Sequence, residues 1–275
     1  MNFRRMHSKY LQFITEVLES ASMMAKNAYG IVATTVKSED ENQVLTETDL
    51  AISKFLIDTI RRLFPYHSII DEEAGIIDNN SDYTWVIDPI DGTSNFAQGV
   101  PLYGIMIGLL EGGSPIVGGI ALPSFAEICV AEKGSGAWCN NAKLTVSNET
   151  NLASALVAYG IDKHQIDTDF TRKECKLLAE IILNVRNIRS SNSVFDTVMV
   201  AKGKYGGVLN RASRIWDNVA QQVLIEEAGG LYTDFFGQPI DYSDPLSKSN
   251  KNYTFCAAPL ALHKQLQEII HGTGM

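Results

Sequence analysis

The chain has 275 residues, of which 45% are apolar and 20% are charged, and its formal net charge is −9. These proportions are typical of a folded globular protein with room for one large domain or two joined lobes. The acidic balance argues against a nucleic-acid partner or an anionic membrane surface, because both are bound through a surplus of basic side chains.

The N-terminal stretch MNFRRMHSKY is basic but leads into no apolar core, so we expect no secretory signal. No apolar run approaches the roughly 20 residues that cross a bilayer. Cys129, Cys139, Cys175 and Cys256 form no CxxC pair, and we expect ordinary buried thiols rather than a disulfide framework. Together these features predict a cytoplasmic protein with no membrane partner.

The first half of the chain is predicted to begin with two helices and to continue as a sheet. Thr48 or Asp49 is expected to cap the second helix, because both side chains accept hydrogen bonds from a helix N-terminus. The elements predicted from periodicity and turn residues are helices over 9–29 and 48–63, a buried strand over 83–88 and an antiparallel meander over 103–144.

The second half alternates strands with helices. Its predicted strands cover 155–160, 186–190, 205–209, 230–235 and 253–259, and its predicted helices cover 171–184, 193–202, 217–228 and 260–271. The change of rhythm near residue 150 favours two closely joined lobes, an α+β lobe over 1–150 and an α/β lobe over 151–275.

Two aspartates stand three residues apart in WVIDPIDGTSNF, at the end of an apolar run. Asp-Pro and Asp-Gly pairs are common turn formers, which is one interpretation of Asp88 and Asp91. The other is a cation site, because neighbouring carboxylates repel unless one holds a proton or a cation lies between them. Gly92 and Thr93 then open a predicted helix whose free N–H groups attract an anion. A cation beside an anion is typical of metal-assisted phosphoryl chemistry.

Further carboxylates stand in similar settings. Glu72 and Glu73 follow the apolar run HSIID, Asp49 lies at a predicted helix start, and Asp217 follows a tryptophan at another. Each alone is more often a helix cap or a solvated charge. Only the whole set favours a shared site.

The segments DEEAG, WVIDPIDGTSNF and WDNVAQQVLIEEAGG, with VLTETD upstream, resemble the inositol monophosphatase family of Mg²⁺-dependent, lithium-sensitive phosphomonoesterases. The resemblance extends from about residue 10 to residue 260. It implies a layered αβαβα sandwich, a homodimer, two or three Mg²⁺ ions per site and a small phosphorylated metabolite as the substrate.

The resemblance also implies a role for each matching residue. Thr93 with Asp49 would orient the attacking water, and Glu72 completes the implied catalytic group. The implied metal ligands are Glu72, Asp88, the carbonyl of Ile90, Asp91 and Asp217. The implied substrate contacts are Ile90, Asp91, Gly92, Thr93, Asn192, Ser193, Asn210 and Asp217.

The chain departs from the family pattern on the substrate side. Asn210 stands where members that prefer inositol phosphate carry a glutamate, and Asn192 with Ser193 replaces a Gly-Ser or Gly-Thr pair. Arg211 and Arg214 lie nearby, either as surface charges or as contacts for a second phosphate, and Lys37 corresponds loosely to a lysine near the family's metals. Inositol 1-phosphate is therefore the first expected substrate, with NADP(H) or fructose 1,6-bisphosphate as alternatives.

Other classes fit less well. Haloacid-dehalogenase-like phosphatases place their paired aspartates two residues apart, and an EF-hand loop needs ligands at alternate positions and a glutamate at position 12. The five scattered histidines do not indicate a zinc site. A non-catalytic phosphate sensor stays open as an alternative, although such a protein would have no use for the Asp49–Thr93 pair.

Overall fold

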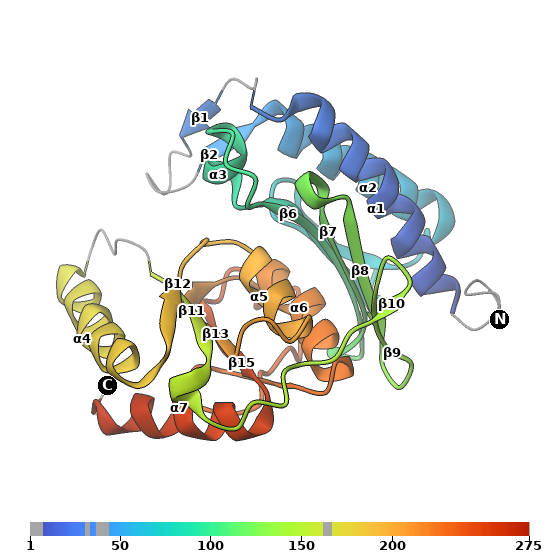
Figure 1. Cartoon of the computed structure of the whole chain (residues 1–275). Coiled ribbons are helices and arrows are strands. Elements are labelled where there is room, and N and C mark those ends of the chain that lie inside the picture. Colours follow the sequence, from blue (N-terminus) through green and yellow to red (C-terminus); the bar gives the residue numbers. More distant parts are fainter. Residues whose placement is uncertain (1–7, 31–33, 37–43, 162–166, 275) are drawn as a thin grey trace.

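The structure is a computed structural model that describes residues 8–30, 34–36, 44–161 and 167–274. Its helices and sheets alternate in five layers (Figure 1). The helices are α1 (Lys9–Ala28), α2 (Glu47–Leu63), α3 (Thr93–Ala97), α4 (Thr168–Asn184), α5 (Phe195–Ala201), α6 (Ile215–Glu227) and α7 (Leu260–Gly272), with 3-10 turns at Pro123–Phe125 and Leu152–Ser154.

The first two helices form where the sequence predicts them, but α2 begins differently. Its N-cap is Thr46, whose hydroxyl accepts hydrogen bonds from the N–H groups of Thr48 and Asp49. The expectation that Thr48 or Asp49 caps this helix is therefore wrong. Asp49 is the third helical residue, and its carboxylate accepts the N–H of Thr46, which completes a capping box.

An eight-stranded sheet follows, in the order β10-β9-β8-β7-β6-β5-β3-β4. The predicted meander is confirmed, since the strands from β5 to β10 pair antiparallel in chain order, whereas β3 and β5 pair parallel. Strands β3 and β4, only four and three residues long, are not predicted from the sequence. The strands are β3 (Ser68–Asp71), β4 (Gly75–Ile77), β5 (Tyr83–Asp91), β6 (Gly104–Glu111), β7 (Ser114–Leu122), β8 (Glu127–Glu132), β9 (Gly136–Cys139) and β10 (Ala142–Lys143).

A five-stranded sheet is built from the second half, in the order β12-β11-β13-β15-β14. β11 pairs parallel with β12 and β13, whereas β15 pairs antiparallel with β13 and β14. The strands are β11 (Leu156–Gly160), β12 (Asn187–Arg189), β13 (Gly207–Ser213), β14 (Leu231–Thr233) and β15 (Tyr253–Ala258), and a separate hairpin joins β1 (Thr34–Val36) to β2 (Val44–Thr46).

The layers follow from which faces are apolar. The first two helices cover one face of the larger sheet, α5 and α6 lie between the two sheets, and α4 and α7 cover the outer face of the smaller sheet (Figure 1). One apolar cluster takes residues from both sheets and both central helices, among them Ile120, Val198, Ala220 and Val208. The fold is the layered αβαβα sandwich expected from the sequence, whereas the boundary near residue 150 stays a prediction.

The structure also bears on the expectations about the cysteines and about membrane-spanning helices. Cys129, Cys139 and Cys256 are buried thiols as predicted, but Cys175 is exposed, because α4 turns Glu174, Leu177 and Ile181 inward and leaves Cys175 on its outer face. Within the described part of the chain, no helix combines the length and the apolar character needed to cross a membrane.

Candidate active site

Asp88 and Asp91 share one side of β5 because this strand is irregular between them. Asp88 is opposite Met106 and Asp91 is opposite Gly104, so three steps along β5 match two steps along β6. In a regular strand, residues three apart point to opposite faces. The extra residue in this bulge turns Asp91 back toward the side of Asp88. Pro89 fits there, since proline in a strand interior is tolerated at bulges.

Asp217 reaches the same place from α6. It is the third residue of that helix, and its carboxylate accepts the backbone N–H of Arg214 at 2.5 Å. A carboxylate at this position is favoured by the unpaired N–H groups and the dipole of the helix N-terminus. The same contact that begins the helix therefore holds Asp217 toward the end of β5.

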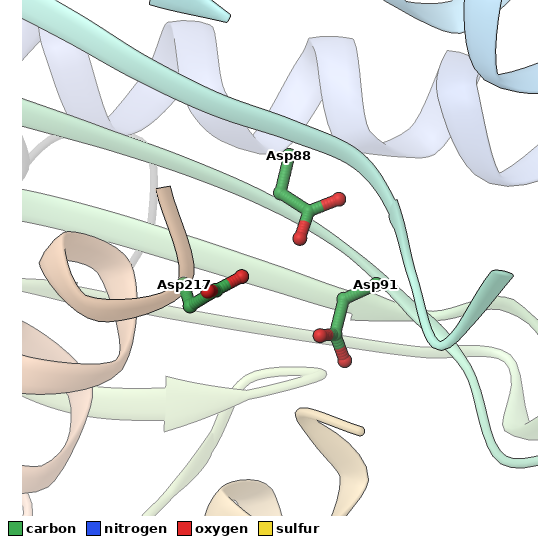
Figure 2. Close-up of side chains that lie close together, drawn as sticks. All are labelled: Asp88, Asp91 and Asp217. Carbon is green, nitrogen blue, oxygen red and sulfur yellow. The ribbon is translucent and has the colours of Figure 1, made fainter. Parts of the chain in front are cut away.

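The three carboxylates converge on one space (Figure 2), with one oxygen from each lying within 4.8 Å of the others. Burial, followed by the charges of Glu72 and Asp91, raises the pKa of Asp88 well above its usual range. Burial and then Asp217 do the same to the pKa of Asp91, and burial followed by Glu72 raises the pKa of Asp217 to about 7. Crowded carboxylates of this kind fit a hard divalent cation, which takes oxygen ligands and removes their repulsion.

An unpaired, buried carboxylate oxygen supports the interpretation of the cluster as a cation site. Oδ1 of Asp88 is buried and has no hydrogen-bond partner among the described residues. Leaving a buried charged oxygen unpaired is costly unless a cation or a proton satisfies it. The donor set therefore suits a metal ion.

Glu72 joins the cluster through the parallel pairing of β3 with β5. Asp71 is opposite Ile87, and the N–H of Glu72 donates to the carbonyl of Ile87 at 3.2 Å. Glu72 therefore lies beside Asp88, and its charge is among the causes that raise the pKa of all three aspartates.

Asp49 and Thr93 meet next to the cluster, as expected from the sequence. The hydroxyl of Thr93 lies 3.3 Å from Oδ1 of Asp49 and 2.8 Å from the carbonyl oxygen of Ile90. Asp49 is buried, and burial raises its pKa to about 6 although hydrogen bonds from Thr46 lower it. A threonine hydroxyl whose proton is held by either acceptor keeps its lone pairs for a water or a substrate group.

Gly92 connects this pair to the substrate side. Its φ is +80°, a left-handed conformation, and a Cβ there would approach Cβ of Ser193 to 2.9 Å and the carbonyl oxygen of Leu102 to 3.1 Å. Only glycine fits such a position. The N–H groups that follow, in the first turn of α3, have no acceptor within the helix.

A pocket of about 140 Å³ opens beside the carboxylates. Its wall includes Asp91, Asp217, Asn192, Ser193 and Asn210, so the structure brings these predicted substrate contacts to one place. Of the described residues that line it, none is a lysine or an arginine.

Comparison with known proteins decides the family. The profile of the inositol monophosphatase family matches residues 6–271. The chain belongs to the inositol monophosphatase family. As a member, it is an enzyme of the phosphoric monoester hydrolase class.

Alignments with similar proteins extend over most of this chain. "Fructose-1,6-bisphosphatase/inositol-1-monophosphatase" from Aquifex aeolicus is 29% identical over 253 residues, which are 90% of this chain and 93% of that protein. "Nus factor SuhB" from Pasteurella multocida is 34% identical over 206 residues, 74% of this chain and 76% of that protein. The solved structure of an IMPase from Thermotoga maritima is 26% identical, with a TM-score of 0.85 over 97% of this chain and 98% of that one.

The residues that depart from the family pattern have a structural explanation. Asn192 has a φ of +49°, and asparagine is among the non-glycine residues that tolerate the left-handed region best. Oδ1 of Asn210 accepts the N–H of Ala212 at 2.7 Å, and Nδ2 lies 2.8 Å from where a Cβ on Gly160 would be. Gly160 therefore leaves the space into which Asn210 presents its amide donor.

Neither of the two arginines lines the pocket. Arg211 lies over the ring of Phe170, 4.3 Å from its centroid, and near Phe235 and Phe236. It follows Asn210 on β13, where the pairing with β15 becomes irregular, and its guanidinium lies against these rings. Arg214 donates to the carbonyl oxygen of Asn250. Lys37 lies outside the described residues.

Three polar residues near the site are not predicted from the sequence. Asp71 and Asp196 are buried acids, and Gln221 is a buried amide that donates to the carbonyl of Asp217. Asp196 accepts the N–H of Ser191 at 2.9 Å and lines the pocket with Gln221. Asp196 and Gln221 lie inside predicted helices and Asp71 ends an apolar run, so only their burial in the fold makes them notable.

Proposed function

We propose that this enzyme hydrolyses a small phosphate monoester with Mg²⁺, and that inositol 1-phosphate is its main substrate. The observation that carries the proposal is the unpaired, buried Oδ1 of Asp88 within a cluster of carboxylates that the Asp49–Thr93 pair adjoins. A hard cation fits that cluster, and a water bound beside it would be within reach of the pair.

Glu72, Asp88, the carbonyl of Ile90, Asp91 and Asp217 would hold two or three Mg²⁺ ions. Bound Mg²⁺ supplies charge neutralisation of the phosphate, a lower pKa for a coordinated water and support for the leaving oxygen. In the structure the carbonyl of Ile90 accepts the Thr93 hydroxyl at 2.8 Å, and Oδ1 of Asp49 lies 3.3 Å from the same hydroxyl. Once the carbonyl of Ile90 holds a cation, Asp49 would be the acceptor of that single proton.

The chain's own groups have separate tasks in this reaction. The N–H groups of Gly92 and Thr93 would bind the phosphate oxygens, since the first turn of a helix offers donors without acceptors. The Thr93 hydroxyl would accept a hydrogen bond from the attacking water while it donates to Asp49. Asp49 then holds the proton of that hydroxyl, which fixes the direction from which the water attacks.

The pocket favours a neutral polyol over a second phosphate. Its described lining contains Asp91, Asp196 and Asp217 but no basic side chain, and Arg211 lies against aromatic rings instead. A second phosphate would be recognised through arginine or lysine. Asn192 and Asn210 offer amide donors and acceptors that suit hydroxyl groups.

Phosphate release with Mg²⁺ from inositol 1-phosphate, NADP⁺ and fructose 1,6-bisphosphate, compared by kcat/KM under one set of conditions, tests the substrate. We expect inositol 1-phosphate to be preferred. A preference for NADP⁺ or the bisphosphate would overturn the polyol proposal, and no hydrolysis of any of them or of an aryl phosphate would favour the sensor.

Three properties implied by the family resemblance or by the composition belong to the same proposal. We expect a homodimer, inhibition by lithium and a cytoplasmic location. Sedimentation, a lithium titration of phosphate release and cell fractionation test them one by one.

A further inference from the structure

Helix α2 is tied to the ends of two neighbouring strands. Through Asp49 it contacts Thr93, which follows β5, and through Ser53 it contacts Asp71, which ends β3. Asp49 and Ser53 are four residues apart, and residues at that spacing share one face of a helix. Both are buried, with exposed fractions of 1% and 2%.

Asp71 also fixes the turn that carries Glu72. Its Oδ1 accepts the hydroxyl of Ser53 at 2.7 Å and the N–H groups of Glu73 at 2.9 Å and Ala74 at 2.8 Å. Asp71 is the last residue of β3, and Glu72 is the first residue of the turn that follows. The side chain of Asp71 contacts α2, whereas the charge of Glu72 raises the pKa of the three clustered aspartates.

We propose that Asp71 and Ser53 are positioning residues, which set Glu72 on one side and Asp49 on the other to a common geometry. One oxygen of Asp71 receives all three donors, so the turn after β3 and the first turns of α2 cannot shift independently. The inference rests on the proposed function, since it assumes that Glu72 binds a cation and that Asp49 acts through Thr93. Partners of this kind typically alter metal affinity or activity about 10-fold to 100-fold when they are removed.

Three variants separate the parts of this arrangement. Asp71→Asn keeps an oxygen at the Oδ1 position and should retain all three contacts. Asp71→Leu keeps the volume but loses every acceptor, and Ser53→Ala loses only the link to α2. Asp234→Leu is the matched control, because Oδ1 of Asp234 accepts the N–H groups of Phe236 and Gln238 in a similar turn after the edge strand β14.

The readouts are kcat and KM for an aryl phosphate, the Mg²⁺ concentration for half-maximal rate, and Mg²⁺ binding by calorimetry. For Asp71→Leu we expect kcat to fall about 10-fold to 100-fold and Mg²⁺ binding to weaken, with KM changing less. Ser53→Ala should lower kcat but leave Mg²⁺ binding close to that of the wild type. Asp71→Asn should keep both kcat and Mg²⁺ binding close to the wild-type values. Asp234→Leu should lower the melting temperature without changing kcat.

The outcomes are distinguishable. Wild-type kcat and Mg²⁺ binding in Asp71→Leu, or equal losses in Asp234→Leu, would overturn the inference. Should Asp71→Leu fail to fold, Ser53→Ala decides: an unchanged kcat refutes the link. A wild-type protein that binds Mg²⁺ but hydrolyses nothing would refute the proposed function, and the calorimetric comparison would still test Asp71.

A second inference rests on two thiols in the larger sheet. Cys129 on β8 and Cys139 on β9 are directly opposite each other, and their Sγ atoms are 2.7 Å apart. Opposite residues of antiparallel strands have Cα atoms about 4.5–5.5 Å apart, within the range that a disulfide spans. The hydrogen bond from Cys129 lowers the pKa of the Cys139 thiol, which is the more exposed of the two at 6%.

We infer that Cys129 and Cys139 form a peroxide-sensitive dithiol site. The Cys139 thiolate attacks hydrogen peroxide and becomes a sulfenic acid while hydroxide leaves. The Cys129 thiol then attacks that sulfur and expels a second hydroxide, and the two hydroxides take up the two thiol protons. Two thiols and one peroxide thus give one disulfide and two waters.

Alkylation and mass spectrometry of the intact protein after peroxide treatment test this site. We expect two thiols to disappear with the loss of two hydrogens, a cross-linked peptide that joins β8 to β9, and recovery with dithiothreitol. Cys175, exposed, and Cys256, buried without a thiol neighbour in the described structure, are internal controls that should not pair. The inference would be overturned if both Cys129 and Cys139 could still be alkylated after peroxide treatment and denaturation.

Discussion

At the scale of single residues, the charge state of Asp217 shows what the carboxylate cluster costs when no cation is bound. Its pKa rises from the ordinary 3.8 to about 7, chiefly through burial and then through Glu72. Between these values the folded chain holds a proton that the unfolded chain has lost. The contribution of Asp217 to the free energy of unfolding of the cation-free protein therefore falls as pH rises from about 4 to about 7 and is constant above that.

Asp217→Asn should weaken the pH dependence of stability, because Asp88 and Asp91 keep their own raised pKa values. In EDTA at pH 8 the variant should be more stable than the wild type, because the repulsion that involves Asp217 is gone and the amide oxygen still accepts the N–H of Arg214. At pH 5 the two should unfold at similar urea concentrations. A variant that is less stable than the wild type at both pH values would show that capping of α6 outweighs the repulsion.

The left-handed backbone of Gly92 fixes the tight turn between β5 and α3. Gly92→Ala should lose about 1 kcal/mol for the left-handed conformation, and the contacts with Ser193 and Leu102 would displace the turn. A displacement of about 1 Å at a reacting centre costs up to about 100-fold in rate. Gly229→Ala is the control, because Gly229 has a φ of +89° and no atom within 4 Å of where a Cβ would be. Phosphate release and urea unfolding of both variants check this, and equal kcat values would contradict it.

At the scale of elements, the sequence predicts α1, α2, the meander and the closing helix, because their apolar periods extend over many residues. It does not predict the bulge in β5, which depends on pairing with β6, or the short strand β3, which exists through its pairing with β5. The resemblance names Asp88 and Asp91 as ligands, but only the bulge explains why aspartates three apart share one side. The role of Asp71 cannot be predicted from the sequence, because its contacts with α2 and with its own turn form only in the folded chain.

In the proposed mechanism, the capping box of α2 links helix formation to catalysis through Asp49. Thr46→Ala should cost about 1 kcal/mol of stability through the lost cap. It should also move the acid limb of the pH–rate profile to higher pH, because the variant loses the hydrogen bond from the Thr46 hydroxyl, which lowers the pKa of Asp49. Thr46→Ser should keep both properties. An unchanged profile in the alanine variant would argue that Asp49 does not titrate in the working enzyme.

At the scale of the whole molecule, the cluster joins parts that are distant in the chain. Asp88 and Asp91 belong to the larger sheet and Glu72 directly follows its strand β3, whereas Asp217 lies in the first turn of α6, which is between the two sheets (Figure 1). A cation held by both would bind the folded chain and not the unfolded one. It would therefore stabilise the entire fold by mass action.

Mg²⁺ should raise the melting temperature of the wild type at pH 8. At 100 times the dissociation constant the gain is about 2.7 kcal/mol, or roughly 5–10 °C at about 2–4 °C per kcal/mol for a protein somewhat smaller than this one. Calorimetric melting of the wild type and of Asp88→Asn, with and without Mg²⁺, measures it. A shift of equal size in the variant would place the cation elsewhere.

The most direct test of a metal-dependent reaction is phosphate release from inositol 1-phosphate by the wild type and by Asp88→Asn, each with Mg²⁺ and with EDTA. We predict turnover only for the wild type with Mg²⁺, while circular dichroism shows that the variant keeps its fold. Near-wild-type release by Asp88→Asn, or release that persists in EDTA, would contradict a metal-dependent reaction at this cluster.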